Sequence, residues 1–295
     1  MRHLLLPALA LCQGLSVPAT AQESEPTKTV RSEAEPGGAG NRFSITAGAD
    51  VVTEYISRGV MFAEEVSFQP QLTISMDFPE LEGGIVDDAG LFVGSWGSIK
   101  LGSVPPGPAG RLTRFYETDL YAGAAFRLSE RWTISATYFR YESLGNSFEG
   151  YNDLELVVGY DDSGVWQDII PLDNFSLSPS LRLVQEAGRP GRSDALYVQP
   201  SLTPSFDARL GGASVHVAVP LMIGLSDEYY DGLDGGTETF GFFRTGLILS
   251  GKPAPEKAPG LTVRGGFDLW VPNGDVASGL DRYDVVGRIG LSWTR

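Results

Sequence analysis

Charged side chains recur at every second position within short apolar segments of this chain. Because side chains alternate between the two faces of a strand, these charges share one face and their apolar neighbours share the other. Rings or opposed patches of such charges set the ion selectivity of a pore, whereas pairs of opposite sign fill a closed interior with salt bridges. Both interpretations are open, and the candidate residues are Asp50, Arg58, Asp77, Glu117, Asp119, Arg127, Asp153, Glu155, Arg182, Arg264, Asp268, Asp284 and Arg288.

Arg58 and Gly59 stand directly after the first expected strand. One interpretation is a basic constriction or ligand contact near the mouth of a barrel. The other is a turn, in which Gly59 supplies a permissive backbone and Arg58 pairs with a neighbouring carboxylate. The sequence favours the turn.

Residues that could carry out catalysis are scarce. A serine nucleophile needs an adjacent base, usually histidine, and beyond residue 21 the chain has only His216, on the polar face of an expected strand. There is no phosphate loop, dinucleotide fingerprint or Cys/His cluster, so we predict no enzyme, cofactor or metal centre. Residues 227–236 combine carboxylates with glycines, as calcium sites do, but their spacing favours a solvated acidic loop.

About twelve segments of alternating polarity must position these charges. The expected strands are residues 43–55, 67–78, 90–101, 115–128, 132–142, 152–161, 175–185, 195–206, 213–223, 237–249, 261–270 and 282–293. In an exported chain this pattern predicts an all-β fold, a transmembrane antiparallel up-and-down barrel with apolar residues towards lipid and both termini in the periplasm. A soluble secreted β-sandwich is the alternative.

Two further features bear on this barrel. Proline removes a ladder donor, so we expect local bulges at Pro70, Pro179, Pro200 and Pro204. Aromatic residues near strand ends predict girdles at the membrane interfaces, formed by Tyr55, Phe78, Trp132, Tyr160, Trp270, Tyr283 and Trp293.

The N-terminus predicts export. A basic start, an apolar core at residues 4–15 that is too short to span a bilayer, and Ala-Thr-Ala at 19–21 are typical of a secretory signal peptide over residues 1–21. Cys12, the single cysteine, lies inside it, so the exported chain has no disulfide. Residues 22–41 are polar and rich in Glu, Pro and Gly, which predicts a disordered periplasmic lead. Residues 42–295 are expected to form one barrel domain.

The charge of the chain restricts its partners. It contains 22 Lys and Arg against 37 Asp and Glu, a net charge of −15. This balance disfavours nucleic acid and is compatible with loops that meet divalent cations or lipopolysaccharide.

The first strands resemble a known family. Tyr-Ile-Ser-Arg-Gly-Val at 55–60, Ser-Phe-Gln-Pro-Gln-Leu at 67–72 and Gly-Ser-Trp-Gly-Ser at 94–98, followed by residues 117–123 and 132–138, resemble the TorF family of proteobacterial barrels. The resemblance implies a porin-like channel in the outer membrane of a Gram-negative bacterium, through which small hydrophilic solutes diffuse passively. It also implies contact with outer-membrane lipid, lipopolysaccharide and the barrel assembly machinery. The C-terminal Trp293-Thr294-Arg295 departs from the usual terminal aromatic residue. The alternative function is a non-conducting structural or adhesive barrel that presents acidic loops.

Overall fold

The computed structural model describes residues 42–102 and 113–295. The predicted signal peptide and periplasmic lead lie outside the described residues and stay predictions. The strands are β1 (Phe43–Val52), β2 (Tyr55–Ser57), β3 (Val60–Ala63), β4 (Ser67–Asp77), β5 (Val86–Lys100), β6 (Phe115–Leu128), β7 (Trp132–Glu142), β8 (Tyr151–Tyr160), β9 (Asp173–Ser176), β10 (Ser180–Ala187), β11 (Leu196–Leu202), β12 (Ser205–Leu210), β13 (Ala213–Ala218), β14 (Leu221–Asp231), β15 (Thr237–Gly251), β16 (Leu261–Pro272) and β17 (Asp284–Thr294), with a 3₁₀ turn at Pro79–Leu81.

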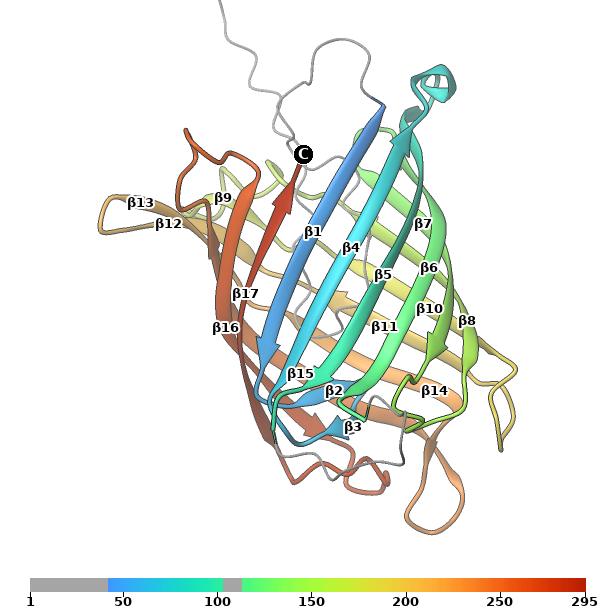
Figure 1. The fold of residues 1–295 in the computed structure, drawn as a ribbon. Helices are drawn as coiled ribbons and strands as arrows, with labels where there is room; N and C mark the ends of the chain where they lie inside the picture. The colour runs from blue at the N-terminus through green and yellow to red at the C-terminus, as the bar shows by residue number, and fades with distance from the viewer. Residues whose placement is uncertain (1–41, 103–112) are drawn as a thin grey trace, which may run out of the picture.

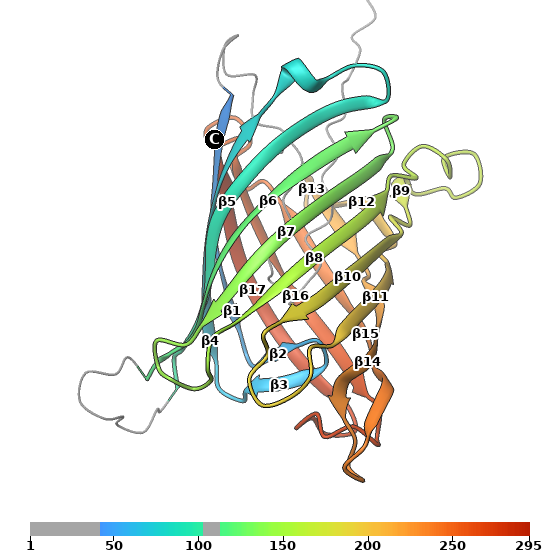
Figure 2. The ribbon, with the colours of Figure 1, turned by 90° about the vertical axis from the view of Figure 1, so that its right-hand side faces the viewer.

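Twelve of these strands form a closed antiparallel barrel. Their order around the sheet is β14, β11, β10, β8, β7, β6, β5, β4, β1, β17, β16 and β15, and β15 pairs in turn with β14. Figures 1 and 2 show the resulting cylinder. A closed sheet leaves no free edge, so the predicted all-β barrel of about twelve strands is confirmed and the sandwich alternative is wrong.

The two ends of the barrel differ. At one end, called here the terminal end, β1 begins beside the last residue of the chain, where Ile45 N–H donates to Arg295 O at 2.9 Å. The opposite end, called the hairpin end, holds β2 and β3 (Figure 1). Among the described residues, no helix is both long and apolar enough to cross a membrane.

Prolines interrupt three neighbouring strands towards the terminal end. Pro179, Pro204 and Pro220 occupy the breaks between β9 and β10, β11 and β12, and β13 and β14, because proline has no N–H to donate to a ladder. Beyond the breaks β12 and β13 continue as a hairpin that projects from the barrel (Figure 1). The bulges expected at Pro70 and Pro200 are wrong, since both residues sit in ladders of unbroken register.

The outer surface is apolar and the interior is polar. Alternate residues of the strands expose large apolar side chains on the outside, including Leu91, Val93, Leu120, Leu154, Val285, Ile289 and Leu291. The inward positions between them hold most of the buried charged residues of the chain. This arrangement is the one that a lipid-facing barrel requires.

The predicted aromatic girdles are partly wrong. Trp132, Tyr283 and Trp293 do lie exposed near strand ends on the outside. Trp270 is instead fully buried and faces inwards, because the exposed Val271 takes the outward position beside it. Tyr55 is also buried, since it belongs to a hairpin that enters the barrel.

A charge on the outer surface should therefore destabilise the barrel in lipid. We expect Ile289→Arg, at a residue that is 61% exposed, to lower the free energy of unfolding in vesicles by about 2–4 kcal/mol, the cost of arginine at mid-bilayer. Ser292→Arg, which changes an inward-facing residue of the same strand, is the matched control and should cost less. Equal losses in urea titrations would contradict the assignment of the two faces.

Candidate functional site in the barrel lumen

A β-hairpin lies inside the barrel at the hairpin end. β1 ends at Val52 and not at residue 55 as expected, and the chain then forms β2 and β3. Arg58 and Gly59 make the turn with φ of 48° and 77°, the two left-handed residues that a type I′ hairpin requires. Figure 2 shows this hairpin lying across the barrel mouth. Ile56 at its centre is fully buried, so the hairpin fills the space between the walls.

One side of the hairpin packs against β5 and β6. Tyr55 Oη donates a hydrogen bond to Glu117 Oε2 at 3.0 Å, and its ring lies 5.5 Å from that of Trp96. Burial, followed by the nearby carboxylates of Glu117 and Asp119, raises the pKa of Tyr55 well above its ordinary value. The hydroxyl therefore stays protonated and remains a donor to Glu117.

The turn of the hairpin reaches a different wall. A β-carbon at Gly59 would collide with the ring of Phe242 on β15, and Phe242 in turn packs on Trp270 with ring centroids 4.9 Å apart. Only glycine fits this position, because the contact and the positive φ both exclude a side chain. The hairpin thus bridges the lumen from β5 and β6 to β15.

Arg58 is held in a cage of acidic and aromatic side chains. Its Nη2 donates to Asp153 Oδ2 at 2.5 Å and to Tyr141 Oη at 3.3 Å. The guanidinium carbon lies 5.4 Å from the ring centroid of Tyr197 and 5.6 Å from that of Tyr229. The turn and the carboxylate partner that the sequence favoured are both present, but the arginine points into the barrel and is buried.

Next to the hairpin, an ion pair crosses three strands. Arg264 on β16 binds Asp50 on β1 through two hydrogen bonds, Nε to Oδ1 at 2.9 Å and Nη2 to Oδ2 at 2.5 Å. Gly290 of β17 lies between them in register, and a β-carbon there would collide with the Asp50 carboxylate. This glycine leaves the space in which the two-point ion pair forms.

A second, fully buried group lies on β15, β16 and β17. Arg244 Nε and Nη2 donate to Asp268 Oδ1 at 3.1 and 2.7 Å, and Arg288 Nε lies 3.4 Å from Asp268 Oδ2. Arg244 was not among the residues selected from the sequence. The available signal was that Arg244 is the single charged residue between positions 239 and 251, within an otherwise apolar strand.

The structure brings together most of the charges selected from the sequence. On β10, Arg182 Nε donates to Glu155 Oε2 at 2.5 Å. Ten of the charged residues selected from the sequence are buried inside the barrel: Asp50, Arg58, Glu117, Asp119, Asp153, Glu155, Arg182, Arg264, Asp268 and Arg288. Asp77, Arg127 and Asp284 lie apart from this group, at or near strand ends. The tyrosines around Arg58 were not anticipated either, because their positions depend on how distant strands align.

Towards the terminal end the lumen is lined by hydroxyl groups. Ser180 and Ser201 share a hydrogen bond of 2.6 Å across β10 and β11, and Thr46 and Thr294 share one of 3.1 Å across β1 and β17. Beyond the wall strands, on the projecting hairpin of β12 and β13, His216 faces Asp207 with Nδ1 and Oδ1 2.9 Å apart. Hydroxyl groups both donate and accept hydrogen bonds, so this part of the lumen can form hydrogen bonds with polar groups of either kind.

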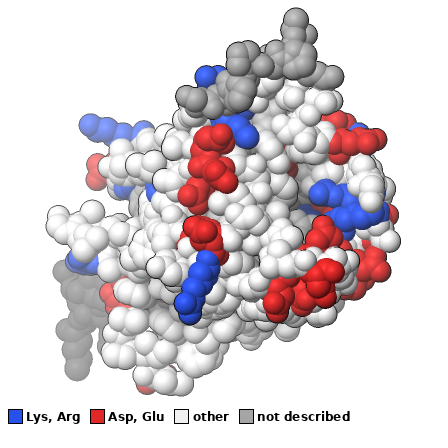
Figure 3. Space-filling view, turned by 90° about the horizontal axis from the view of Figure 1, so that it is seen from below, with Lys and Arg blue, Asp and Glu red and all other residues white. Residues whose placement is uncertain are grey.

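The sequence suggested that the acidic segment 227–236 is a single loop, and this prediction is wrong. β14 continues to Asp231, and Tyr229 and Tyr230 within it are buried. No group of three or more potential metal ligands occurs among residues 42–102 and 113–295. Acidic side chains do gather at the hairpin end, as the view onto that end shows (Figure 3).

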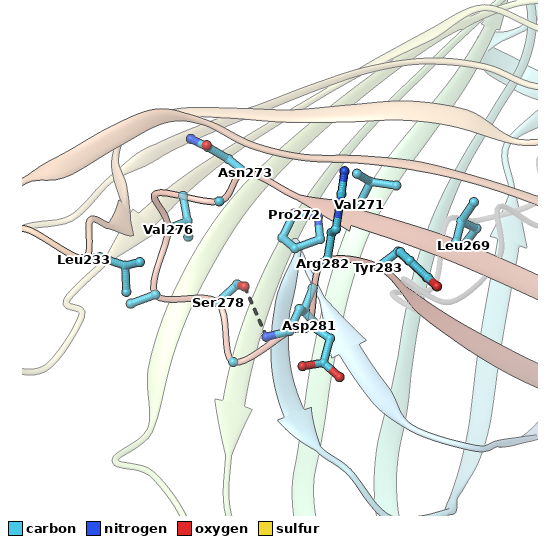
Figure 4. A pocket seen from close by; sticks show the side chains of 14 residues that line it. Leu233, Leu269, Val271, Pro272, Asn273, Val276, Ser278, Asp281, Arg282 and Tyr283 are labelled. Carbon is cyan, nitrogen blue, oxygen red and sulfur yellow. Dashed lines mark hydrogen bonds between the residues drawn. The ribbon is translucent and has the colours of Figure 1, made fainter.

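The loop between β16 and β17 holds the outer edge of the hairpin. Met61 N–H donates to Ser278 O at 2.9 Å. The loop borders an open, largely apolar pocket of about 900 Å³ (Figure 4), and Leu280 N–H donates to Ser278 Oγ at 3.2 Å within it. Leu233 N–H donates to Asp275 O at 2.8 Å, which ties this loop to the loop after β14.

Comparisons with known proteins show similar barrels at low identity. No protein-family model matches the chain, and no curated protein matches it. Similar solved structures include the KdgM porin, 10% identical over 85% of this chain and 98% of that chain with a TM-score of 0.40. The NanC porin is 12% identical over 85% and 98%, with a TM-score of 0.41. The β domain of the Bordetella autotransporter Brka is 12% identical over 86% and 99%, with a TM-score of 0.43.

At these identities and TM-scores the similarity carries no argument about function. The barrel is established by the strand pairing of this chain itself. The resemblance to the TorF family stays a prediction, because no family model matches.

Proposed function

We propose that this chain is an outer-membrane channel of the TorF type for passive diffusion of small hydrophilic solutes, closed at its hairpin end by β2 and β3. The observation that carries the proposal is the contrast between the two faces of the barrel. Large apolar side chains cover the outside, while charged and hydroxyl-bearing side chains line the inside. A polar lumen within an apolar wall is what passage of water-soluble molecules through lipid requires.

The positions of the termini support an orientation. Both ends of the barrel sequence lie at the terminal end, which faces the periplasm in bacterial barrels of this kind. The hairpin then closes the outer mouth. A solute that enters from outside meets the hairpin first, then the ion pairs, and last the hydroxyl-lined region.

Closure by a hairpin implies a moving part. Arg58 and Ile56 are buried between the walls of the barrel, and in this proposal conduction requires the hairpin to withdraw. Tyr55, Arg58 and Met61 each join the hairpin to a different part of the barrel by a hydrogen bond, and these bonds must break when the hairpin withdraws. Opening of a lid of this kind occurs on a scale of roughly microseconds to seconds.

The filled lumen also favours a second candidate function. Buried ion pairs such as Arg182–Glu155 and Arg264–Asp50 suit a non-conducting barrel whose role lies in its acidic outer surface. In that case neutralising Arg182 and Arg264 should reduce stability and alter no ion selectivity. The two candidates differ in one observable, which is solute flux.

Liposome swelling tests the proposal. Vesicles containing the refolded protein are diluted into isotonic solutions of neutral and charged sugars of increasing size. We expect swelling with the smallest sugars and a sharp loss with larger ones, because the lumen is narrow. No swelling, from protein whose β-rich circular dichroism and heat-modifiable gel mobility are intact, would leave the non-conducting barrel as the function.

A further inference from the structure

The cage around Arg58 has the chemistry of a binding site for organic cations. It combines one carboxylate, Asp153, with the hydroxyl of Tyr141 and the faces of Tyr197 and Tyr229. We propose that these four residues form a site for guanidinium and related small organic cations, and that Arg58 occupies it as a built-in ligand. The role of this site rests on the proposed function, because organic cations would then be a solute class of the channel. Binding of the cation does not depend on conduction.

The geometry matches this ligand class at each contact. A carboxylate 2.5 Å from a guanidinium nitrogen makes a charge-assisted hydrogen bond, which is stronger than a neutral one. Two aromatic faces within 6 Å of the cation add attraction from their ring quadrupoles, and this attraction increases in a site that excludes water. The Arg58 and Asp153 side chains are 4% and 0% exposed, so this site excludes water.

The wall strands carry the residues of the cage, and aromatic contacts between strands support them. Tyr141 and Tyr151 stack with ring centroids 4.6 Å apart on neighbouring strands β7 and β8, and Tyr229 packs on Tyr197 at 5.8 Å. Arg189 also lies over Tyr151, at 3.8 Å. The barrel wall therefore positions the cage residues, and we expect them to keep their places when Arg58 is removed.

Two other arginines near the cage, Arg182 over the ring of Tyr197 and Arg192 over that of Tyr229, have carboxylate partners of their own. Arg182 binds Glu155, and Arg192 binds Glu186 at 2.7 Å. Loss of the Arg58 guanidinium would leave Asp153 without its partner at 2.5 Å. A buried carboxylate that loses its cation is costly, so an external cation would gain free energy by taking the vacant place.

In the unaltered protein a free cation has to compete with Arg58. A tethered group competes at a local concentration in the millimolar range, which hides weak binding by a free solute. The site is therefore tested in Arg58→Ala, with methylguanidinium as the probe. This ion supplies the guanidinium group without the chain that carries it.

We expect Arg58→Ala to melt at a lower temperature than the unaltered protein in detergent micelles, measured by the heat-modifiable gel shift. Millimolar methylguanidinium chloride should raise the midpoint again in a saturable way, whereas sodium chloride at equal ionic strength should not. Arg58→Ala combined with Asp153→Asn should need at least about tenfold more methylguanidinium, because one charge-assisted hydrogen bond is lost. Arg282→Ala, at an exposed loop arginine, is the control and should show neither effect.

Other outcomes decide against the site. The proposed site would be overturned if sodium chloride raised the melting midpoint of Arg58→Ala as much as methylguanidinium does. It would also be overturned if the double variant responded to the same methylguanidinium concentrations as Arg58→Ala. If Arg58→Ala does not fold, Arg58→Gln keeps most of the side-chain volume and allows the same titration. If methylguanidinium stabilises Arg58→Ala in a saturable way but liposomes do not swell, the cation site is supported and the channel is contradicted. If liposomes swell but methylguanidinium does not stabilise the variant, the channel is supported and the cation site is contradicted.

Discussion

Crosslinking the hairpin to the β16–β17 loop should abolish solute flux through the barrel. A β-carbon placed on Gly279 lies 3.3 Å from the β-carbon of Met61, close to the spacing of roughly 3.5–4.5 Å found in disulfides. We therefore expect the double variant Met61→Cys, Gly279→Cys to form a disulfide under mild oxidation. Its liposome swelling rate should then fall to that of protein-free vesicles and recover after reduction, because the hairpin is fixed in the mouth only while oxidised.

The design has a matched control. The single variant Met61→Cys experiences the same oxidant and reductant but cannot form the link, so its swelling rate should not depend on redox state. Gly279 has φ of +73°, so its replacement strains the loop, but this strain is present in both redox states. Unchanged flux in the oxidised double variant, with the disulfide shown by mass spectrometry, would mean that solutes pass without movement of the hairpin.

Removal of the Asp268 carboxylate should have the largest effect on stability. Asp268 is fully buried and serves both Arg244 and Arg288. We expect Asp268→Asn to lower the free energy of unfolding by about 3–5 kcal/mol, because it leaves buried arginine charge without compensation. Urea titration of the protein in vesicles, followed by tryptophan fluorescence, measures this loss.

Two further variants distinguish the effect of unpaired buried arginine charge from a general effect of losing a carboxylate. Asp275→Asn, in the exposed loop before β17, should change stability by less than about 0.5 kcal/mol. Adding Arg244→Met to Asp268→Asn should recover part of the loss, since one unpaired charge is then removed. A loss of equal size for Asp268→Asn and Asp275→Asn would contradict the role assigned to the buried group.

The barrel could be predicted from the sequence because each strand carries its own signal. Alternation of apolar and polar residues is local, and it identified both the approximate number of strands and the inward face of residues such as Asp119, Asp153 and Asp268. The polar sides had to face inwards, since only apolar side chains suit contact with lipid. The ends of strands were predicted less accurately: the first strand was expected to run to Tyr55 but ends at Val52.

The hairpin and its cage could not be predicted, because they depend on distant parts of the chain. Residues 56–63 lie between two expected strands, and the turn at Arg58 and Gly59 was the favoured interpretation, but no local pattern indicates that this segment enters the lumen. The partner of Arg58 is 95 residues away in the sequence. Arg244 was missed because the residues before it do not alternate simply in polarity: Phe242 is buried inside the barrel while Phe243 is exposed outside.

Single-channel recording of the Met61→Cys, Gly279→Cys variant tests the central claim most directly. The oxidised protein is inserted into a planar bilayer at constant voltage, and reductant is then added to the same membrane. We predict a silent membrane at first and discrete current steps after reduction, because release of the hairpin opens a polar lumen. Current of the same size before and after reduction would contradict closure by the hairpin, and a silent membrane throughout, from correctly folded protein, would contradict the channel itself.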